Sequence, residues 1–214
     1  MAAETVLLDL DGTLSDSRPG IVACFRFMLS ELGHDGEAVG DLTWAVGPPI
    51  GIAIRRLLGQ FGDDRFDLAL ATYRARYTDT GIYECTRYQG VHEMLAELAA
   101  GGRRLFIATA KRRDYAERVV DYLGLRAHLP TVYGSLPAGG LDDKADLLAH
   151  IIAAERLDPA TTVMVGDRSH DIHAAKANAV RSIGVLWGYG GETELREAGA
   201  DGLAAVPADV LRAV

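Results

Sequence analysis

Cysteine is scarce in this 214-residue sequence, and that scarcity excludes a disulfide framework. The two cysteines, Cys24 and Cys85, lie in different expected elements, and so few thiols suit a reducing, cytoplasmic location. A basic segment followed by an apolar stretch is missing from the N-terminus, so no secretory signal is expected. No apolar run approaches the roughly 20 residues that span a bilayer, which excludes a membrane-spanning role.

An excess of positive charge is also missing. The 22 basic residues are outnumbered by 30 acidic ones, for a net charge of −8, which argues against a broad basic face for nucleic acid. With 49% hydrophobic and 24% charged residues the composition is that of an ordinary globular protein. The length allows one domain, with or without an insertion. The pattern leaves open whether the protein is a monomer or a homodimer.

The segment Asp9-Leu10-Asp11-Gly12-Thr13 directly follows the apolar run at residues 6–8. A short strand that ends in two carboxylates one residue apart places both at one strand terminus, and Gly12 permits a tight turn there. Two acids so close repel each other unless they share a proton or a cation. Mg²⁺ would relieve that repulsion and could hold a phosphate. Taken alone, the segment is equally well read as an acidic turn after an edge strand.

Short apolar runs alternate with amphipathic helical patterns along most of the chain. This alternation predicts parallel strands joined by right-handed crossovers, and therefore an α/β fold with a doubly wound, mostly parallel sheet. Such sheets bind ligands beyond the carboxyl ends of their strands, where Asp9, Thr109 and Asp167 are expected. The expected strands are residues 5–10, 104–108, 131–134, 162–165 and 181–186.

Residues 16–85 interrupt the alternation, because they contain no convincing strand. Apolar residues recur there at helical spacing, and glycine and proline punctuate the run, which predicts a compact insert of about four helices. We therefore expect an α/β core formed by residues 1–15 and 86–214, with residues 16–85 as a helical insert that caps the strand ends.

Three further features recur in a fixed order after the first acidic motif: Thr109 at a strand end, Lys144 before an amphipathic helix, and Asp167 and Asp171 in the segment Gly-Asp-Arg-Ser-His-Asp. Each is weak alone. Together they resemble the haloacid dehalogenase superfamily, over essentially the whole chain. The resemblance implies a Rossmann-like core with a helical cap, and a magnesium-dependent phosphatase.

The resemblance also implies a role for each residue. Asp9 is the expected nucleophile and would form an aspartyl-phosphate, while Asp11 would transfer protons to the leaving group and from water. Thr109 and Lys144 would bind the phosphoryl group. The expected magnesium ligands are Asp9, the Asp11 backbone carbonyl and Asp167.

Asp171 has two readings. It is either a ligand through water or an orienting group beside the metal, or simply an acid in the first turn of a helix. Ala110 departs from the family pattern, because relatives often carry Asn or Ser after the strand-ending threonine.

The closer resemblance is to the phosphoglycolate-phosphatase-like branch, through features such as Gly47-Pro48-Pro49 and Gly188-Tyr189-Gly190. The expected substrate is a small phosphorylated metabolite, either phosphoglycolate-like or a nucleoside 5′-monophosphate. A sugar phosphomutase and an inactive phosphate-binding regulatory protein are the alternatives; mutases of this branch carry a histidine early in the first cap helix, and residues 18–23 have none. Four residues of the insert are candidates for contacting the leaving group: Arg55, Arg56, Arg74 and Tyr77.

Overall fold

The computed structural model describes residues 3–214, which form two compact units. The α/β unit comprises the chain up to Asp16 together with Arg87–Val214, and the helical unit comprises Ser17–Thr86. Each boundary lies one residue later than in the division expected from the sequence. Within residues 3–214 no helix has both the length and the apolar character needed to cross a bilayer.

The α/β unit is built on a six-stranded sheet in the order β5-β4-β1-β6-β7-β8, and all its neighbouring strands pair in parallel. The doubly wound α/β prediction is confirmed. Five strands match the expected runs to within a few residues, whereas the sixth, β8, has too weak a pattern to be found from the sequence. The strands are β1 (Thr5–Leu8), β4 (Arg104–Arg112), β5 (Val132–Ser135), β6 (Thr162–Gly166), β7 (Arg181–Val185) and β8 (Gly202–Ala204).

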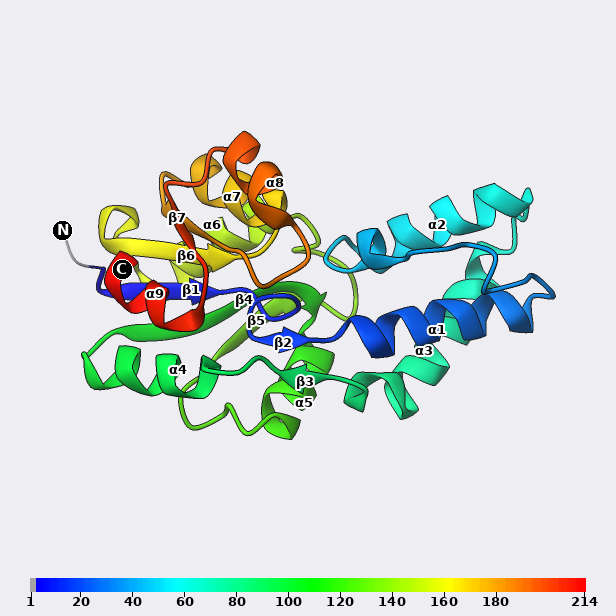
Figure 1. Ribbon diagram of the computed structural model, residues 1–214, viewed down its shortest axis with the longest axis horizontal. Coiled ribbons are helices and arrows are strands. Elements are labelled where there is room, and N and C mark those ends of the chain that lie inside the picture. The colour runs from blue at the N-terminus through cyan, green and yellow to red at the C-terminus, as the bar shows by residue number, and fades with distance from the viewer. Residues whose placement is uncertain (1–2) are drawn as a thin grey trace. The chain divides into compact units, whose positions relative to one another are not determined.

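Helices cover both faces of this sheet (Figure 1). On one face lie α6 (Lys144–Glu155), α7 (Ser169–Ala177) and α8 (Gly191–Ala198), and on the other lie α4 (Val91–Ala100), α5 (Arg113–Tyr122) and α9 (Pro207–Ala213). A short 3-10 helix, η3 (Pro159–Thr161), precedes β6. Because both faces are covered, the strands need continuous apolar sequence rather than alternation.

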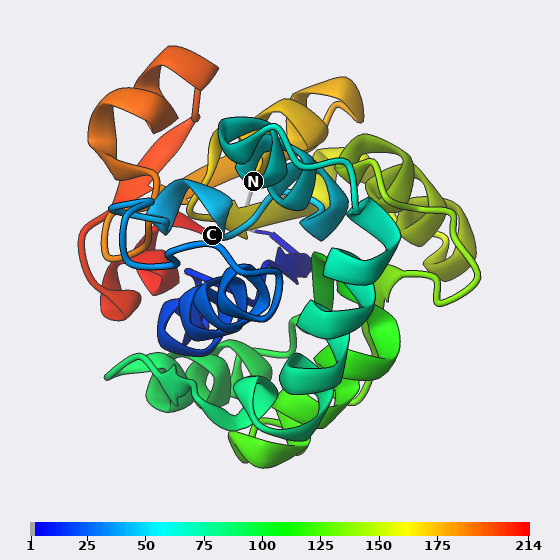
Figure 2. The same ribbon diagram turned by 90° about the vertical axis from the view of Figure 1, so that its right-hand side faces the viewer.

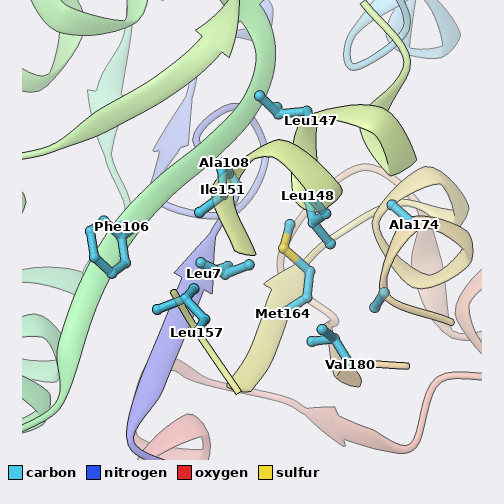
Figure 3. Packing of buried hydrophobic residues seen from close by; sticks show 11 residues of the cluster. Leu7, Phe106, Ala108, Leu147, Leu148, Ile151, Leu157, Met164, Ala174 and Val180 are labelled. Carbon is cyan, nitrogen blue, oxygen red and sulfur yellow. The ribbon is translucent and has the colours of Figure 1, made fainter. Parts of the chain in front are cut away.

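Apolar side chains fill the layer between the sheet and α6 and α7. Leu7, Phe106 and Met164 extend from β1, β4 and β6 toward Leu148 and Ile151 of α6 (Figure 3). These positions are between 0 and 6% exposed. Close packing in this layer fixes the ends of the strands relative to the first turn of α6.

The chain leaves the α/β unit and returns to it at neighbouring points. The Tyr88 N–H donates to the Leu14 carbonyl at 3.2 Å, although the whole helical unit lies between them in the sequence. Two very short strands, β2 (Ser15–Asp16) and β3 (Thr86–Arg87), form a separate two-stranded sheet. The insertion therefore interrupts the sequence of the α/β unit without interrupting its structure.

The helical unit contains α1 (Arg18–Glu31), α2 (Ile50–Phe61) and α3 (Phe66–Asp79), with two 3-10 helices, η1 (Thr43–Ala45) and η2 (Gly81–Tyr83). Helices α1 and α3 pack side by side (Figures 1 and 2), and the Phe25 and Tyr73 rings meet at 4.9 Å. Residues 17–86 thus contain three α-helices and two 3-10 helices, where about four helices were expected. Gly33 and Gly40 have φ values of 85° and 68°, which interrupt helical geometry between α1 and η1.

Candidate active site

A tight turn after β1 holds the first two acids. The Asp9 N–H donates to the Val165 carbonyl at 2.9 Å, which continues the ladder between β1 and β6. Gly12 has φ 88°, and its N–H donates to the Ser15 carbonyl at 2.8 Å, so the chain reverses within a few residues. Asp9 and Asp11 are only 5 and 7% exposed. The structure thus keeps two carboxylates buried at the carboxyl end of the central strand.

Lys144 is the first residue of α6 and reaches this turn. The Asp143 side chain accepts from the N–H groups of Ala145 and Asp146, so the helix begins at a fixed residue. The Lys144 Nζ lies 2.8 Å from the Asp9 Oδ1 and also pairs with the Asp171 Oδ1. The lysine side chain is 9% exposed. Lys144 and Asp9, predicted separately, are therefore in direct contact.

Three carboxylates gather beside this lysine. Asp9, Asp167 and Asp171 are buried, and each offers one oxygen within 4.8 Å of the others. Asp171 lies in the first turn of α7, where its Oδ2 accepts from the Arg168 N–H at 3.1 Å, and its Oδ1 pairs with Lys144. Its expected role beside a metal ion stays a prediction. The turn and the start of α7 bring the acids together from opposite ends of the sequence.

The electrostatics of the cluster reflect this crowding. Burial raises the pKa of Asp9 to about 6 despite its contact with Lys144, and the Asp171 and Asp11 carboxylates act in the same direction. Burial, followed by repulsion from Asp171 and Asp9, raises the pKa of Asp167 well above its usual range. For Lys144, burial lowers the pKa, but Asp171 and Asp9 raise it more, so the pKa lies above its ordinary value. The lysine is charged at neutral pH, and the acids lack sufficient compensating charge.

Glycines allow the backbone to close around Asp167. The Asp167 Oδ2 accepts from the Tyr189 N–H at 2.8 Å. A Cβ added at Gly188 would lie 2.3 Å from the Asp167 Cβ, and one added at Gly12 would lie 2.2 Å from its Oδ2. Any side chain at these two positions would displace the acid. Gly188 was recognised from the sequence only as part of a family feature. The structure gives a steric reason for glycine at this position.

Thr109 is the last residue of β4 before its pairing with β5 becomes irregular, and it is 2% exposed. Its Oγ1 accepts from the Lys111 N–H at 3.2 Å, so the hydroxyl proton is left to donate elsewhere. The residue that the sequence reasoning missed is Lys111 itself, whose Nζ lies 2.6 Å from the Asp11 Oδ1. A lysine two positions beyond the predicted threonine was the available signal.

The four cap candidates lie in the helical unit, and three of them engage aromatic rings there. The guanidinium of Arg55 lies 3.8 Å from the Phe66 centroid, and that of Arg56 lies 3.9 Å from the Trp44 centroid. These contacts give both arginines a structural task within the unit. Tyr77 is buried and stacks on Tyr73, with centroids 5.7 Å apart. Arg74 is exposed on α3.

The donor set fits a hard divalent cation. All three clustered groups are carboxylates, which suit Mg²⁺ rather than a thiolate- or imidazole-preferring metal. Together with Asp11 they supply four negative charges against the ammonium groups of Lys111 and Lys144, so a divalent ion would neutralise the site when all are ionised. Mg²⁺ would be held by Asp9, the Asp11 backbone carbonyl and Asp167, with Asp171 as a ligand through water or as an orienting group.

The sheet is doubly wound, and carboxylates and lysines gather at the carboxyl ends of its central strands. This combination is typical of an α/β enzyme with a carboxylate site. The chain belongs to the haloacid dehalogenase-like hydrolase family, whose model matches residues 6–185. The resemblance inferred from the ordered motifs is therefore confirmed.

Curated relatives differ in the activities their names state. The tyrosine-protein kinase PtkA of Mycobacterium tuberculosis is 39% identical over 87% of this chain, and this match covers 63% of that protein. The solved structure of PtkA superimposes with a TM-score of 0.80 at 33% identity, covering 99% of this chain and 98% of that one. A 5′-nucleotidase of Pseudomonas aeruginosa is 36% identical, covering 89% of this chain and 86% of the relative. A phosphoglycolate phosphatase of Neisseria meningitidis is 34% identical, covering 91% and 85%.

Proposed function

We propose that this protein is a magnesium-dependent phosphomonoesterase that acts on a small phosphorylated metabolite. The observation that carries the proposal is the contact between Lys144 and Asp9 at 2.8 Å, beside the acids Asp167 and Asp171. A carboxylate nucleophile needs a cation close by as negative charge gathers at phosphorus, and this lysine is placed to supply one. The relatives named phosphoglycolate phosphatase and 5′-nucleotidase support the same chemistry.

In the proposed reaction the Asp9 carboxylate attacks phosphorus and forms an aspartyl-phosphate. Asp11 donates a proton to the departing ester oxygen and later takes one from the water that hydrolyses the intermediate. Thr109 would donate its hydroxyl proton to a phosphoryl oxygen, and Lys144 would offset the charge on Asp9 and the phosphoryl group. Bound Mg²⁺ would supply Lewis-acid stabilisation of the phosphoryl oxygens. The protein groups proposed for this path come from the ends of β1 and β4 and from the start of α6.

Substrate choice is proposed to reside in the helical unit. The motif residues all lie in the α/β unit and would meet the phosphoryl group, which every candidate substrate shares. In the family the insert at this position caps the site, so its residues are the candidates for sensing the leaving group. The proposed substrates remain a nucleoside 5′-monophosphate and phosphoglycolate, in a cytoplasmic setting that suits two cysteines that form no disulfide.

Phosphoryl transfer to protein tyrosine is a second candidate, favoured by the 39% identity to a protein named tyrosine-protein kinase. Both activities would use Asp9 and would differ in whether water or a phenol accepts the phosphoryl group.

The test is phosphate release from p-nitrophenyl phosphate, phosphoglycolate and a panel of nucleoside monophosphates, alongside incubation with γ-labelled ATP and a tyrosine peptide. Magnesium-dependent release that Asp9→Asn abolishes would support the phosphatase. Labelled peptide without ester hydrolysis would favour the kinase and contradict the first proposal.

A further inference from the structure

Lys111 forms a buried ion pair with Asp11 that none of the family motifs described above includes. The Lys111 Nζ lies 2.6 Å from the Asp11 Oδ1, and the two side chains are 6 and 9% exposed. The other lysine of the site, Lys144, contacts Asp9 rather than Asp11. Each of the two acids proposed for catalysis thus has its own buried ammonium group.

An irregularity in β4 aims Lys111 at this acid. Thr109 pairs with Gly134 and Arg112 pairs with Ser135, so Ala110 and Lys111 are additional residues on the β4 side of the ladder. Such bulges redirect side chains at strand ends. A Cβ added at Gly134 would lie 2.4 Å from the Lys111 carbonyl oxygen, so glycine is what allows the bulge to approach β5.

The bulge also connects Lys111 to the phosphate-binding candidate. The Lys111 N–H donates to the Thr109 Oγ1 at 3.2 Å, while its side chain holds Asp11. One residue therefore fixes the hydroxyl of Thr109 through its backbone and the carboxylate of Asp11 through its side chain. An ion pair that only stabilised the fold would not need to involve a residue that also contacts Thr109.

We propose that Lys111 is a positioning residue that holds the Asp11 carboxyl group in the orientation from which it transfers protons. This inference rests on the proposed phosphatase function. In the first step Asp11 enters in its protonated form. The Asp9 oxygen bonds to phosphorus, the bond from phosphorus to the ester oxygen breaks, and Asp11 gives its proton to that oxygen. In the second step Asp11 takes a proton from water, the water oxygen bonds to phosphorus, and the bond to Asp9 breaks.

The leaving group makes this role measurable. An alkoxide needs a proton as it departs, whereas p-nitrophenolate is stable without one. The ratio kcat/KM reports steps up to the first irreversible one, which is formation of the aspartyl-phosphate. Loss of a positioned acid should therefore lower kcat/KM for an alkyl phosphate far more than for p-nitrophenyl phosphate.

The experiment compares Lys111→Met, Lys111→Arg and Lys144→Met on p-nitrophenyl phosphate and on the best alkyl ester of the substrate panel. We expect Lys111→Met to lower kcat/KM for the alkyl ester by about 100-fold or more, and for p-nitrophenyl phosphate by less than about tenfold. Lys111→Arg should recover part of the alkyl-ester activity. Lys144→Met should slow both substrates to a similar extent, because Lys144 faces the nucleophile.

A double variant distinguishes an effect exerted through Asp11 from a general change in folding. If Lys111 acts through Asp11, then Asp11→Asn with Lys111→Met should hydrolyse the alkyl ester as Asp11→Asn alone does. Equal losses on both substrates, or additive losses in the double variant, would overturn the inference. A wild-type protein without esterase activity, or an Asp9→Asn variant with full activity, would instead overturn the proposed function.

Discussion

The Lys144 Nζ lies 2.8 Å from the Asp9 Oδ1, which joins the first residue of α6 to the end of β1. The contact depends on where α6 begins, and the Asp143 cap sets that point. Shifting the helix start by one residue would rotate the lysine by about 100° away from the acid. A helix cap is thus part of the geometry proposed for catalysis.

Asp9→Asn should lower kcat/KM for every phosphate ester by at least about a thousandfold, because the amide is neutral and a poor nucleophile. The side chain is close to isosteric, so the circular dichroism spectrum should be unchanged. Asp64→Asn is the matched control, since Asp64 is exposed. Near-normal hydrolysis by a folded Asp9→Asn protein would contradict a covalent mechanism.

Removal of metal with excess EDTA should abolish hydrolysis, and added Mg²⁺ should restore it. Calcium should inhibit, because it prefers more ligands at longer distances and would displace the Asp9 oxygen relative to phosphorus. The measurement is initial rate against each free cation concentration. Full activity in EDTA would show that the cluster of Asp9, Asp167 and Asp171 does not act through a cation.

The free energy of unfolding of the metal-free protein should fall as pH rises from about 5 to about 7. The pKa of Asp9 is raised to about 6 in the folded protein and that of Asp167 is raised well above its usual range. In the unfolded chain both acids have ordinary pKa values and are already ionised across this window, so the folded state binds more protons. Deprotonation then destabilises it.

Urea unfolding at several pH values measures this slope. Asp9→Asn should reduce it, because one of the two titrating groups is removed. Saturating Mg²⁺ should stabilise the protein more at pH 7 than at pH 5, where protons compete for the carboxylates. A slope that Asp9→Asn leaves unchanged would place its origin outside the acidic cluster.

Gly188→Ala should weaken magnesium binding by about 10- to 100-fold, because the new Cβ would press on Asp167 and on the Gly12 carbonyl oxygen. Gly59→Ala in α2 is the matched control, since an added Cβ there meets no atom within 4 Å. That control should stabilise the protein by about 0.5–1 kcal/mol. Thermal-shift titration with Mg²⁺ compares the two, and equal affinities would remove the steric role of Gly188.

Single substitutions Arg55→Ala, Arg56→Ala, Arg74→Ala and Tyr77→Phe should change relative kcat/KM between nucleoside monophosphates and phosphoglycolate by up to about tenfold. Hydrolysis of p-nitrophenyl phosphate should change less. Because Arg55 and Arg56 stack on aromatic rings, their loss should also destabilise the protein by about 0.5–1 kcal/mol each. Arg196→Ala, at an exposed position of α8, is the control. An unchanged substrate ranking in all four variants would remove the helical unit from substrate choice.

The sheet and most residues of the candidate site could be predicted from the sequence, because a local pattern of residues marks the end of each strand. The run before Asp9 and the run before Asp167 are buried on both faces, so each reads as continuous apolar sequence ending in an acid. Lys144 was singled out because it precedes an amphipathic helical run and falls in the order of the family motifs. Parallel topology then requires these ends to meet at one edge of the sheet.

Lys111 could not be placed in the same way. A bulge depends on what the neighbouring strand permits, and here it depends on Gly134, which lies far along the chain. The non-helical stretch between α1 and η1 has a similar origin, because the positive φ values at Gly33 and Gly40 depend on the path of the chain. The stacking of Arg55 and Arg56 also arises from contacts between helices, which helical periodicity does not encode.

The hydrogen bond between Tyr88 and Leu14 has a consequence for how such a chain can change over generations. Because the exit and the return are held together within the α/β unit, the stretch between them can be lengthened, shortened or exchanged without shifting any strand of the sheet. Closing a longer detour costs little, since loop entropy grows only with the logarithm of length. The α/β unit can thus keep its structure and its site residues while the inserted segment changes in evolution.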